Sequence, residues 1–136
     1  MTISLSHCYV TVHDPELALT FYRDALGLEV RKDVSSEGFR WVTLSSATQP
    51  EIEIVLTEPH AGHSAADGDA LLALLTKGSL PGLLFSTPDL DGMFEKIRAS
   101  GAEVLQEPIQ QWWGPRDCAF RDPSGNMVRI SEATST

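Results

Sequence analysis

The chain has 136 residues, 42% of them hydrophobic, and carries a formal net charge of −9 at pH 7. This length predicts a single domain with its own buried core. The negative charge repels phosphate groups, which argues against a nucleic acid or a membrane surface as partner. No apolar run is long enough to span a bilayer, and Cys8 and Cys118 lack the spacing of a metal or redox site. We therefore expect a cytoplasmic protein with two free thiols.

The first predicted element is a strand over residues 6–12, where apolar and polar side chains alternate. Its polar face carries His7, Tyr9 and Thr11. Asp14 and Pro15 then predict the N-cap and the first residue of a helix, which Gly27 ends.

Three short strands are expected next, over residues 28–33, 38–45 and 51–57. Glu53 lies in the last of them and faces away from its apolar neighbours. The pattern of this half is therefore strand, helix and three strands.

Residues 59–81 break this pattern and form a connector with a short helix predicted over 70–75. His60 and His63 stand three residues apart in its polar loop. Solvated side chains are the simpler interpretation of this pair, and metal ligation is the alternative.

The second half repeats the first. Asp89 caps a predicted helix 75 residues after Asp14, and Gly101 ends it 74 residues after Gly27. A strand from Leu83 to Thr87 precedes this helix, and strands are expected over 103–105, 116–121 and 127–131. A loop over 106–115 carries Trp112 and Trp113, and a frayed tail is expected from residue 132. We thus expect modules at about 3–58 and 82–132.

A hairpin turn is predicted at Asp122-Pro123-Ser124-Gly125-Asn126, because proline presets φ at the second position and glycine tolerates the left-handed conformation. In the strand that follows, Arg129 faces away from Val128 and Ile130, which we expect in the core.

Two βαβββ halves, the helix segment at 21–28 and this turn together resemble the vicinal oxygen chelate superfamily. It includes glyoxalase I, bleomycin-resistance and fosfomycin-resistance proteins, methylmalonyl-CoA epimerase and extradiol dioxygenases. The resemblance covers nearly the whole chain. It implies an α+β fold of two facing, cupped, mixed sheets, with a ligand or a metal between the cups.

Metal-using members of the family take ligands at up to four positions, which fall here on His7, Glu53, Gly82 and Arg129. Glycine has no side chain, and the arginine brings a permanent positive charge that repels a cation. We therefore expect no tightly bound catalytic metal. The alternative keeps His7 and Glu53 as ligands of a divalent metal ion, with a third ligand from the connector.

The resemblance also places Arg129 and Glu53 at matching positions of the two halves. They are expected to form an ion pair or to flank a polar ligand, with His7 hydrogen-bonding or exchanging a proton nearby. Purely structural roles for these residues are the competing interpretation. Tyr9 and Thr11 line the cup if His7 does, and Trp41 either lines it or packs in the core. Trp113 is the tryptophan expected in the cup, and a dimer interface is the alternative place for Trp112 and Trp113.

Two functions follow from the resemblance. The first is a small-molecule-binding protein like the antibiotic-resistance branch, working as a homodimer with cavities built across the pair and needing no cofactor. A cationic, flat or glycopeptide-like ligand fits the acidic balance. The second is an enzyme: a metal-dependent lyase, isomerase or dioxygenase, or a metal-free variant in which Glu53 or His7 is the general base and Arg129 stabilises an enolate.

Overall fold

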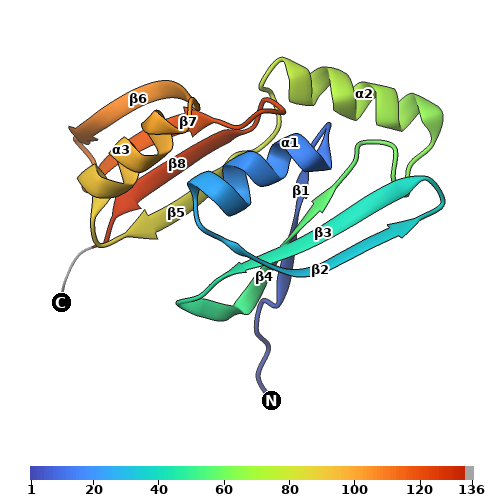
Figure 1. Ribbon diagram of the computed structural model, residues 1–136, viewed down its shortest axis with the longest axis horizontal. Coiled ribbons are helices and arrows are strands. Elements are labelled where there is room, and N and C mark those ends of the chain that lie inside the picture. Colours follow the sequence, from blue (N-terminus) through green and yellow to red (C-terminus); the bar gives the residue numbers. More distant parts are fainter. Residues whose placement is uncertain (134–136) are drawn as a thin grey trace.

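The computed structural model describes residues 1–133, which form two four-stranded mixed sheets together with helices (Figure 1). The first sheet has the order β1(His7–Thr11), β4(Gln49–Thr57), β3(Phe39–Ser46) and β2(Glu29–Ser36). The second has the matching order β5(Leu83–Thr87), β8(Met127–Glu132), β7(Arg116–Arg121) and β6(Glu103–Gln110). In each sheet the first two strands pair in parallel and the others antiparallel. The predicted α+β class with a repeated βαβββ unit is confirmed.

The helices of the repeated unit begin and end where the sequence predicts. Helix α1(Pro15–Leu19) continues into the π-helical segment η1(Thr20–Ala25), and α3(Leu90–Ala99) is the counterpart in the second half. Asp14 and Asp89 each accept hydrogen bonds from backbone N–H groups of the first helical turn. Gly27 and Gly101 follow the helices at φ values of 82° and 92°, a conformation that favours glycine.

Two elements are longer than predicted. Helix α2(Ala65–Thr76) in the connector starts early because Ser64 caps it, accepting a hydrogen bond from the N–H of Asp67. Strand β6 continues to Gln110 through two register shifts that interrupt its alternation, which made this stretch resemble a loop. Of the tail expected to fray, Glu132 belongs to β8, and residues 134–136 lie outside the described part. Within residues 1–133, no helix has the length and apolar character needed to cross a membrane.

A single hydrophobic core joins the two halves. Its cluster takes Val10, Phe21 and Leu56 from the first half and Phe94 and Phe120 from the second. The Phe94 and Phe120 rings lie 5.4 Å apart between their centroids. Because α1, η1 and α3 pack on this core, the opposite face of each sheet is left without a helix (Figure 1).

The predicted turn after β7 connects the halves through the carboxylate of Asp122, whose residue is only 4% exposed. One carboxylate oxygen accepts hydrogen bonds from the backbone N–H groups of the three residues Ser124, Gly125 and Asn126. The other accepts from the Tyr22 hydroxyl at 2.6 Å and from the Asn126 side chain at 2.9 Å. Asn126 also donates to the carbonyl of Thr11 at 2.8 Å. The hairpin turn is thereby fixed to η1 and to the end of β1.

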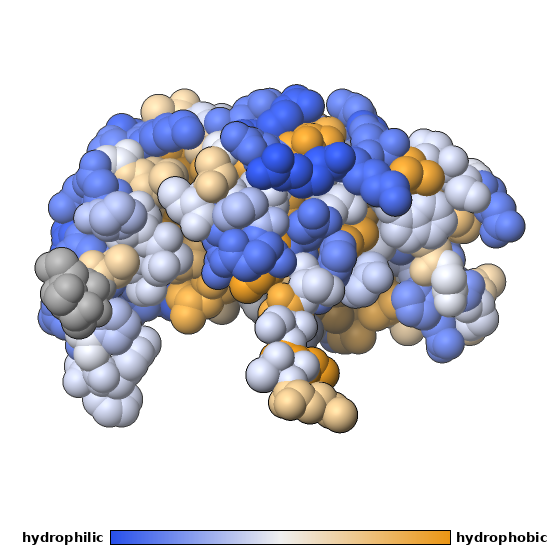
Figure 2. Space-filling model, turned by 90° about the horizontal axis from the view of Figure 1, so that it is seen from below, coloured by the Kyte–Doolittle hydropathy of each residue, from blue (hydrophilic) through white to orange (hydrophobic). Residues whose placement is uncertain are grey.

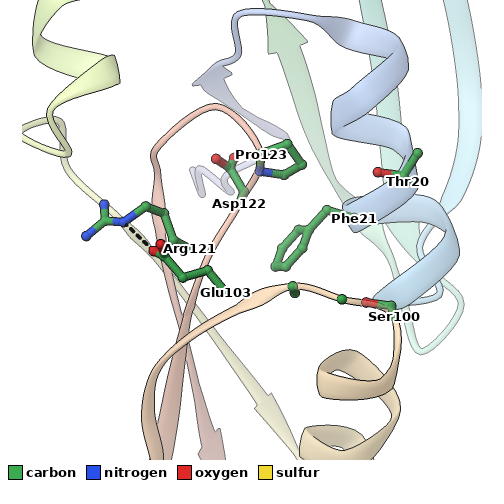
Figure 3. A pocket seen from close by; sticks show the side chains of 9 residues that line it. Thr20, Phe21, Ser100, Glu103, Arg121, Asp122 and Pro123 are labelled. Carbon is green, nitrogen blue, oxygen red and sulfur yellow. Dashed lines mark hydrogen bonds and ion pairs between the residues drawn. The ribbon is translucent and has the colours of Figure 1, made fainter.

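The surroundings of the turn are closely packed. Burial and then the negative charge of Asp122 raise the pKa of Tyr22 well above its usual value, so its hydroxyl stays a donor. A side chain at Gly125 would collide with the carbonyl of Leu75 at the end of α2. Beside the turn lies a pocket of about 270 Å³ that is lined by residues of both halves, including Phe21 and Asp122 (Figure 3). On its wall, the Arg121 guanidinium donates a hydrogen bond to the Glu103 carboxylate at 3.0 Å. The connector helix and both halves therefore meet at this turn.

Removing one hydroxyl tests this junction. Tyr22→Phe leaves one oxygen of the buried Asp122 carboxylate with a single donor, so we expect the free energy of unfolding to fall by about 1–3 kcal/mol. Urea denaturation measures the change. Tyr9→Phe is the matched control, because Tyr9 is 72% exposed and its variant should keep the wild-type stability. Equal stability of both variants would contradict the role of the Tyr22 hydrogen bond.

Candidate functional site

The helix-free face of the first sheet contains a cavity of about 430 Å³, which we call the first-sheet cavity. Its apolar and aromatic lining consists of Tyr9, Val34, Trp41 and Val55, and its polar lining of His7, Lys32, Thr43 and Glu53. In the view of Figure 2, apolar side chains reach the lower surface of the molecule on either side of the projecting N-terminal segment. Every lining residue belongs to the first half.

A hydrogen-bonded pair of titratable side chains occupies one wall of this cavity. His7 and Glu53 are directly opposite in the parallel pairing of β1 and β4, and His7 Nε2 lies 2.9 Å from Glu53 Oε2. The other ring nitrogen, Nδ1, lies 2.9 Å from Ser6 Oγ. The imidazole is therefore oriented by a carboxylate at one ring nitrogen and by a hydroxyl at the other.

Lys32 and Trp41 face this pair from the other two strands. A register shift in β2 between Val30 and Lys32 changes which side chains point into the cavity, and Arg31 instead donates to Ser45 Oγ at 2.6 Å. Within residues 1–133, Lys32 forms no ion pair, so its charge is available to a ligand. Trp41, for which core packing was the alternative, lines the cavity.

Sequence reasoning missed Lys32 because strict alternation along β2 gives no sign of the bulge. Thr43 carried a usable signal, since it stands two residues from Trp41 and shares its face. Of the predicted ligand-binding residues, His7, Tyr9 and Glu53 line the cavity. Thr11 does not, although it shares strand β1 with His7 and Tyr9, and Trp113 is 56% exposed in the second half.

Arg129 lies on the helix-free face of the second sheet and interacts with its own half. Its guanidinium donates to Asp117 at 3.1 Å and to Gln106 at 3.2 Å. Burial alone would raise the pKa of Asp117, but hydrogen bonds from Gln111, Gln106 and Arg129 outweigh it and lower that pKa. The carboxylate is therefore ionised at neutral pH and pairs with the arginine.

The expected ion pair between Arg129 and Glu53 is wrong for a single chain, because Glu53 pairs with His7 and Arg129 with Asp117. The two positions do not match in register either. Glu53 lies opposite His7, whereas Arg129 lies opposite Leu84 rather than Gly82. The register of the parallel strand pair therefore differs by two residues between the halves, and the sequence alone does not show this difference.

The first-sheet cavity has few side chains that can ligate a metal ion. His7 and Glu53 supply two potential ligands, and residues 1–133 contain no group of three or more His, Cys, Asp or Glu side chains placed to hold a metal ion. His60 is paired with Asp69 at 2.8 Å, and His63 bonds the carbonyl of Pro59 at 3.0 Å. Neither histidine lines the first-sheet cavity. The described residues of one chain thus do not fit a catalytic centre with three or four protein ligands.

Cys118 offers no nucleophile in this region. Cys118 is fully buried in the core, and burial followed by the charge of Asp117 raises its pKa to about 11. The thiol is therefore protonated at neutral pH.

Comparisons with known proteins place this geometry in a family. Residues 4–130 match the sequence profile of the Glyoxalase/Bleomycin resistance protein/Dioxygenase superfamily. The uncharacterized protein YurT of Bacillus subtilis is 30% identical over 122 residues, covering 89% of this chain and 92% of that protein.

Two solved structures are similar over nearly their whole length. UcmS2 superimposes with a TM-score of 0.87 at 28% identity, covering 98% of this chain and 100% of that one. TnmS3, an antibiotic binding protein from Streptomyces sp. CB03234, superimposes with a TM-score of 0.76 at 26% identity, covering 98% and 99%. The repeated fold, the Asp122 turn and the profile match agree, and the chain belongs to the Glyoxalase/Bleomycin resistance protein/Dioxygenase superfamily.

Proposed function

We propose that the protein binds a small organic molecule in the first-sheet cavity and needs no tightly bound catalytic metal to do so. The observation that carries this proposal is the cavity lining: aromatic Tyr9 and Trp41 stand beside the hydrogen-bonded pair His7 and Glu53 and the cation of Lys32. Apolar and aromatic walls combined with placed polar groups are typical of small-molecule sites.

The lining also indicates the chemistry of the ligand. A ring can stack on the indole of Trp41, which contributes large apolar area at a low entropic cost. Lys32 favours an acceptor or anionic group at its end of the cavity, even though the chain as a whole is acidic. The similarity to the antibiotic binding protein TnmS3 supports an antibiotic as the class of ligand, and the Trp41 ring favours an aromatic one.

A second copy of the chain completes the site in this proposal. Large apolar side chains are exposed in both halves, among them Tyr9 at 72%, Leu84 at 68% and Trp112 at 91%. Exposed apolar surface of this kind favours association. A homodimer that sets the second sheet of one chain over the first-sheet cavity of the other would bring Arg129 and Trp113 to the ligand.

A metal-free enzyme is the second candidate, favoured by the bond between His7 and Glu53. In this function the imidazole, oriented by the carboxylate, removes a proton from a bound carbon or oxygen acid. Lys32 then stabilises the negative charge that develops. Turnover that is lost in both His7→Ala and Lys32→Met would distinguish this function from binding alone.

Binding is tested with a variant in which Trp41 is the sole indole, made by Trp112→Phe and Trp113→Phe. A panel of aromatic antibiotics and metabolites is titrated, and we expect ligands of the site to quench the emission of Trp41. His7→Ala and Lys32→Met should each raise the Kd about tenfold, since each removes a hydrogen bond involving a polar or charged group. His13→Ala, an exposed histidine outside the cavity, is the control. Ligands whose Kd is the same in all three variants would argue against this site.

Metal independence is tested on protein purified without chelator. Elemental analysis should find far less than one zinc, iron, manganese or nickel ion per chain, because His7 and Glu53 supply only two potential ligands. Treatment with EDTA should leave the Kd of a panel ligand within about twofold. Near-stoichiometric metal that disappears in Glu53→Gln would overturn this part of the proposal.

The homodimer is tested by light scattering after size-exclusion chromatography. We expect twice the 14.8 kDa mass of one chain. Leu84→Glu should shift the protein toward the monomer, because it places a charge on the second-sheet face. Leu74→Glu, on α2, is the matched control and should leave the mass unchanged. A wild-type monomer at high micromolar concentration would refute the completed site.

A further inference from the structure

A groove distinct from the first-sheet cavity runs along the seam between the two halves. Its inner part is a hollow of about 280 Å³ with apolar walls from both halves: Leu26 and Leu28 from the first, and Phe85, Met93 and Ile130 from the second. Sites between packed units of a protein are common places for small ligands.

The groove continues outward around the edge of the second sheet. A second hollow of about 460 Å³ shares Ser46, Thr48, Phe85 and Ser86 with the first, so the two adjoin. β5 is an edge strand. The carbonyl of Phe85 accepts a hydrogen bond from the Ser131 hydroxyl in β8, and the carbonyl of Thr87 accepts one from the N–H of Ala133, just after β8. By alternation, the backbone groups of Leu84 and Ser86 face away from β8, toward the groove. We call both hollows together the seam groove.

The two ends of the seam groove differ in chemistry. The inner end presents aliphatic and aromatic carbon, together with hydroxyls such as those of Ser46 and Thr48, whose oxygens lie 3.0 Å apart. The outer end is lined by Gln49 and Glu51. Of the described residues lining the groove, Glu51 is the one acidic or basic side chain, and it is exposed.

We propose that the seam groove binds an amphipathic organic cation: one ring or a short alkyl chain in the inner hollow, with an ammonium group beside Glu51. The volume of the inner hollow suits a fragment of this size. The carboxylate and the net charge of −9 both attract a cation and disfavour an anion. The seam groove shares no residue with the first-sheet cavity.

The probe is phenethylamine, and its neutral analogue phenethyl alcohol serves as the comparison. Methyl NMR of the full chain separates the sites, because only Met93 of the three methionines lines the groove. We expect a saturable shift of the Met93 methyl signal with phenethylamine, and little change at Met1 and Met127. Glu51→Gln should weaken binding about three- to fivefold, the effect of one exposed ion pair.

Three further variants complete the design. Ser86→Phe, at an exposed position lining both hollows, should abolish binding, and Thr48→Phe repeats this test from the first half. Glu107→Gln removes an exposed acid elsewhere and should have no effect.

Each contrary outcome overturns a defined part of the proposal. If the Met93 methyl signal does not shift at high phenethylamine concentration, the proposed site is wrong. Equal binding of phenethyl alcohol together with an unchanged affinity in Glu51→Gln removes the preference for a cation. Loss of the shift in Trp41→Ala would place the probe in the first-sheet cavity instead.

Discussion

The buried carboxylate of Asp122 constrains how the two halves of this protein are placed. It accepts five hydrogen bonds, of which the one from Tyr22 crosses from the second half to the first. A buried charge is tolerable only when it is well hydrogen-bonded, so the turn, η1 and the end of β1 must be in position together. The arrangement of the two sheets thus depends on one residue of the hairpin turn.

This constraint determines which surfaces remain for function. Because helices and both sheets share one core, the opposite sheet faces are left to bind other molecules. On the first sheet that face is a cavity with aromatic walls and a fixed imidazole, whereas on the second it is a network centred on Asp117 and Arg129. The two halves share a fold, but their helix-free faces carry different side chains. This difference favours a binding site formed by two unlike surfaces over a metal site formed by equivalent ligands from the two halves.

The sequence predicted the structural features that depend on local residue patterns. The caps at Asp14 and Asp89, the glycines that follow the helices, the turn at 122–126 and the two-copy organisation are all confirmed. Features that depend on strand pairing could not be predicted from the sequence. The bulge that turns Lys32 into the cavity and the register that sets Arg129 opposite Leu84 arise between strands. His7 and Glu53 were identified by family position, while their direct hydrogen bond needed the structure.

The central claim is that the first-sheet cavity holds an organic ligand without a metal. Its most direct test is a crystal structure of the protein with a ligand from the binding panel, with anomalous scattering recorded for transition metals. The account predicts ligand density in contact with the Trp41 ring and within hydrogen-bonding distance of His7 or Lys32, with no anomalous peak near Glu53. A metal ion coordinated by His7 and Glu53, or a ligand bound away from this cavity, would contradict it.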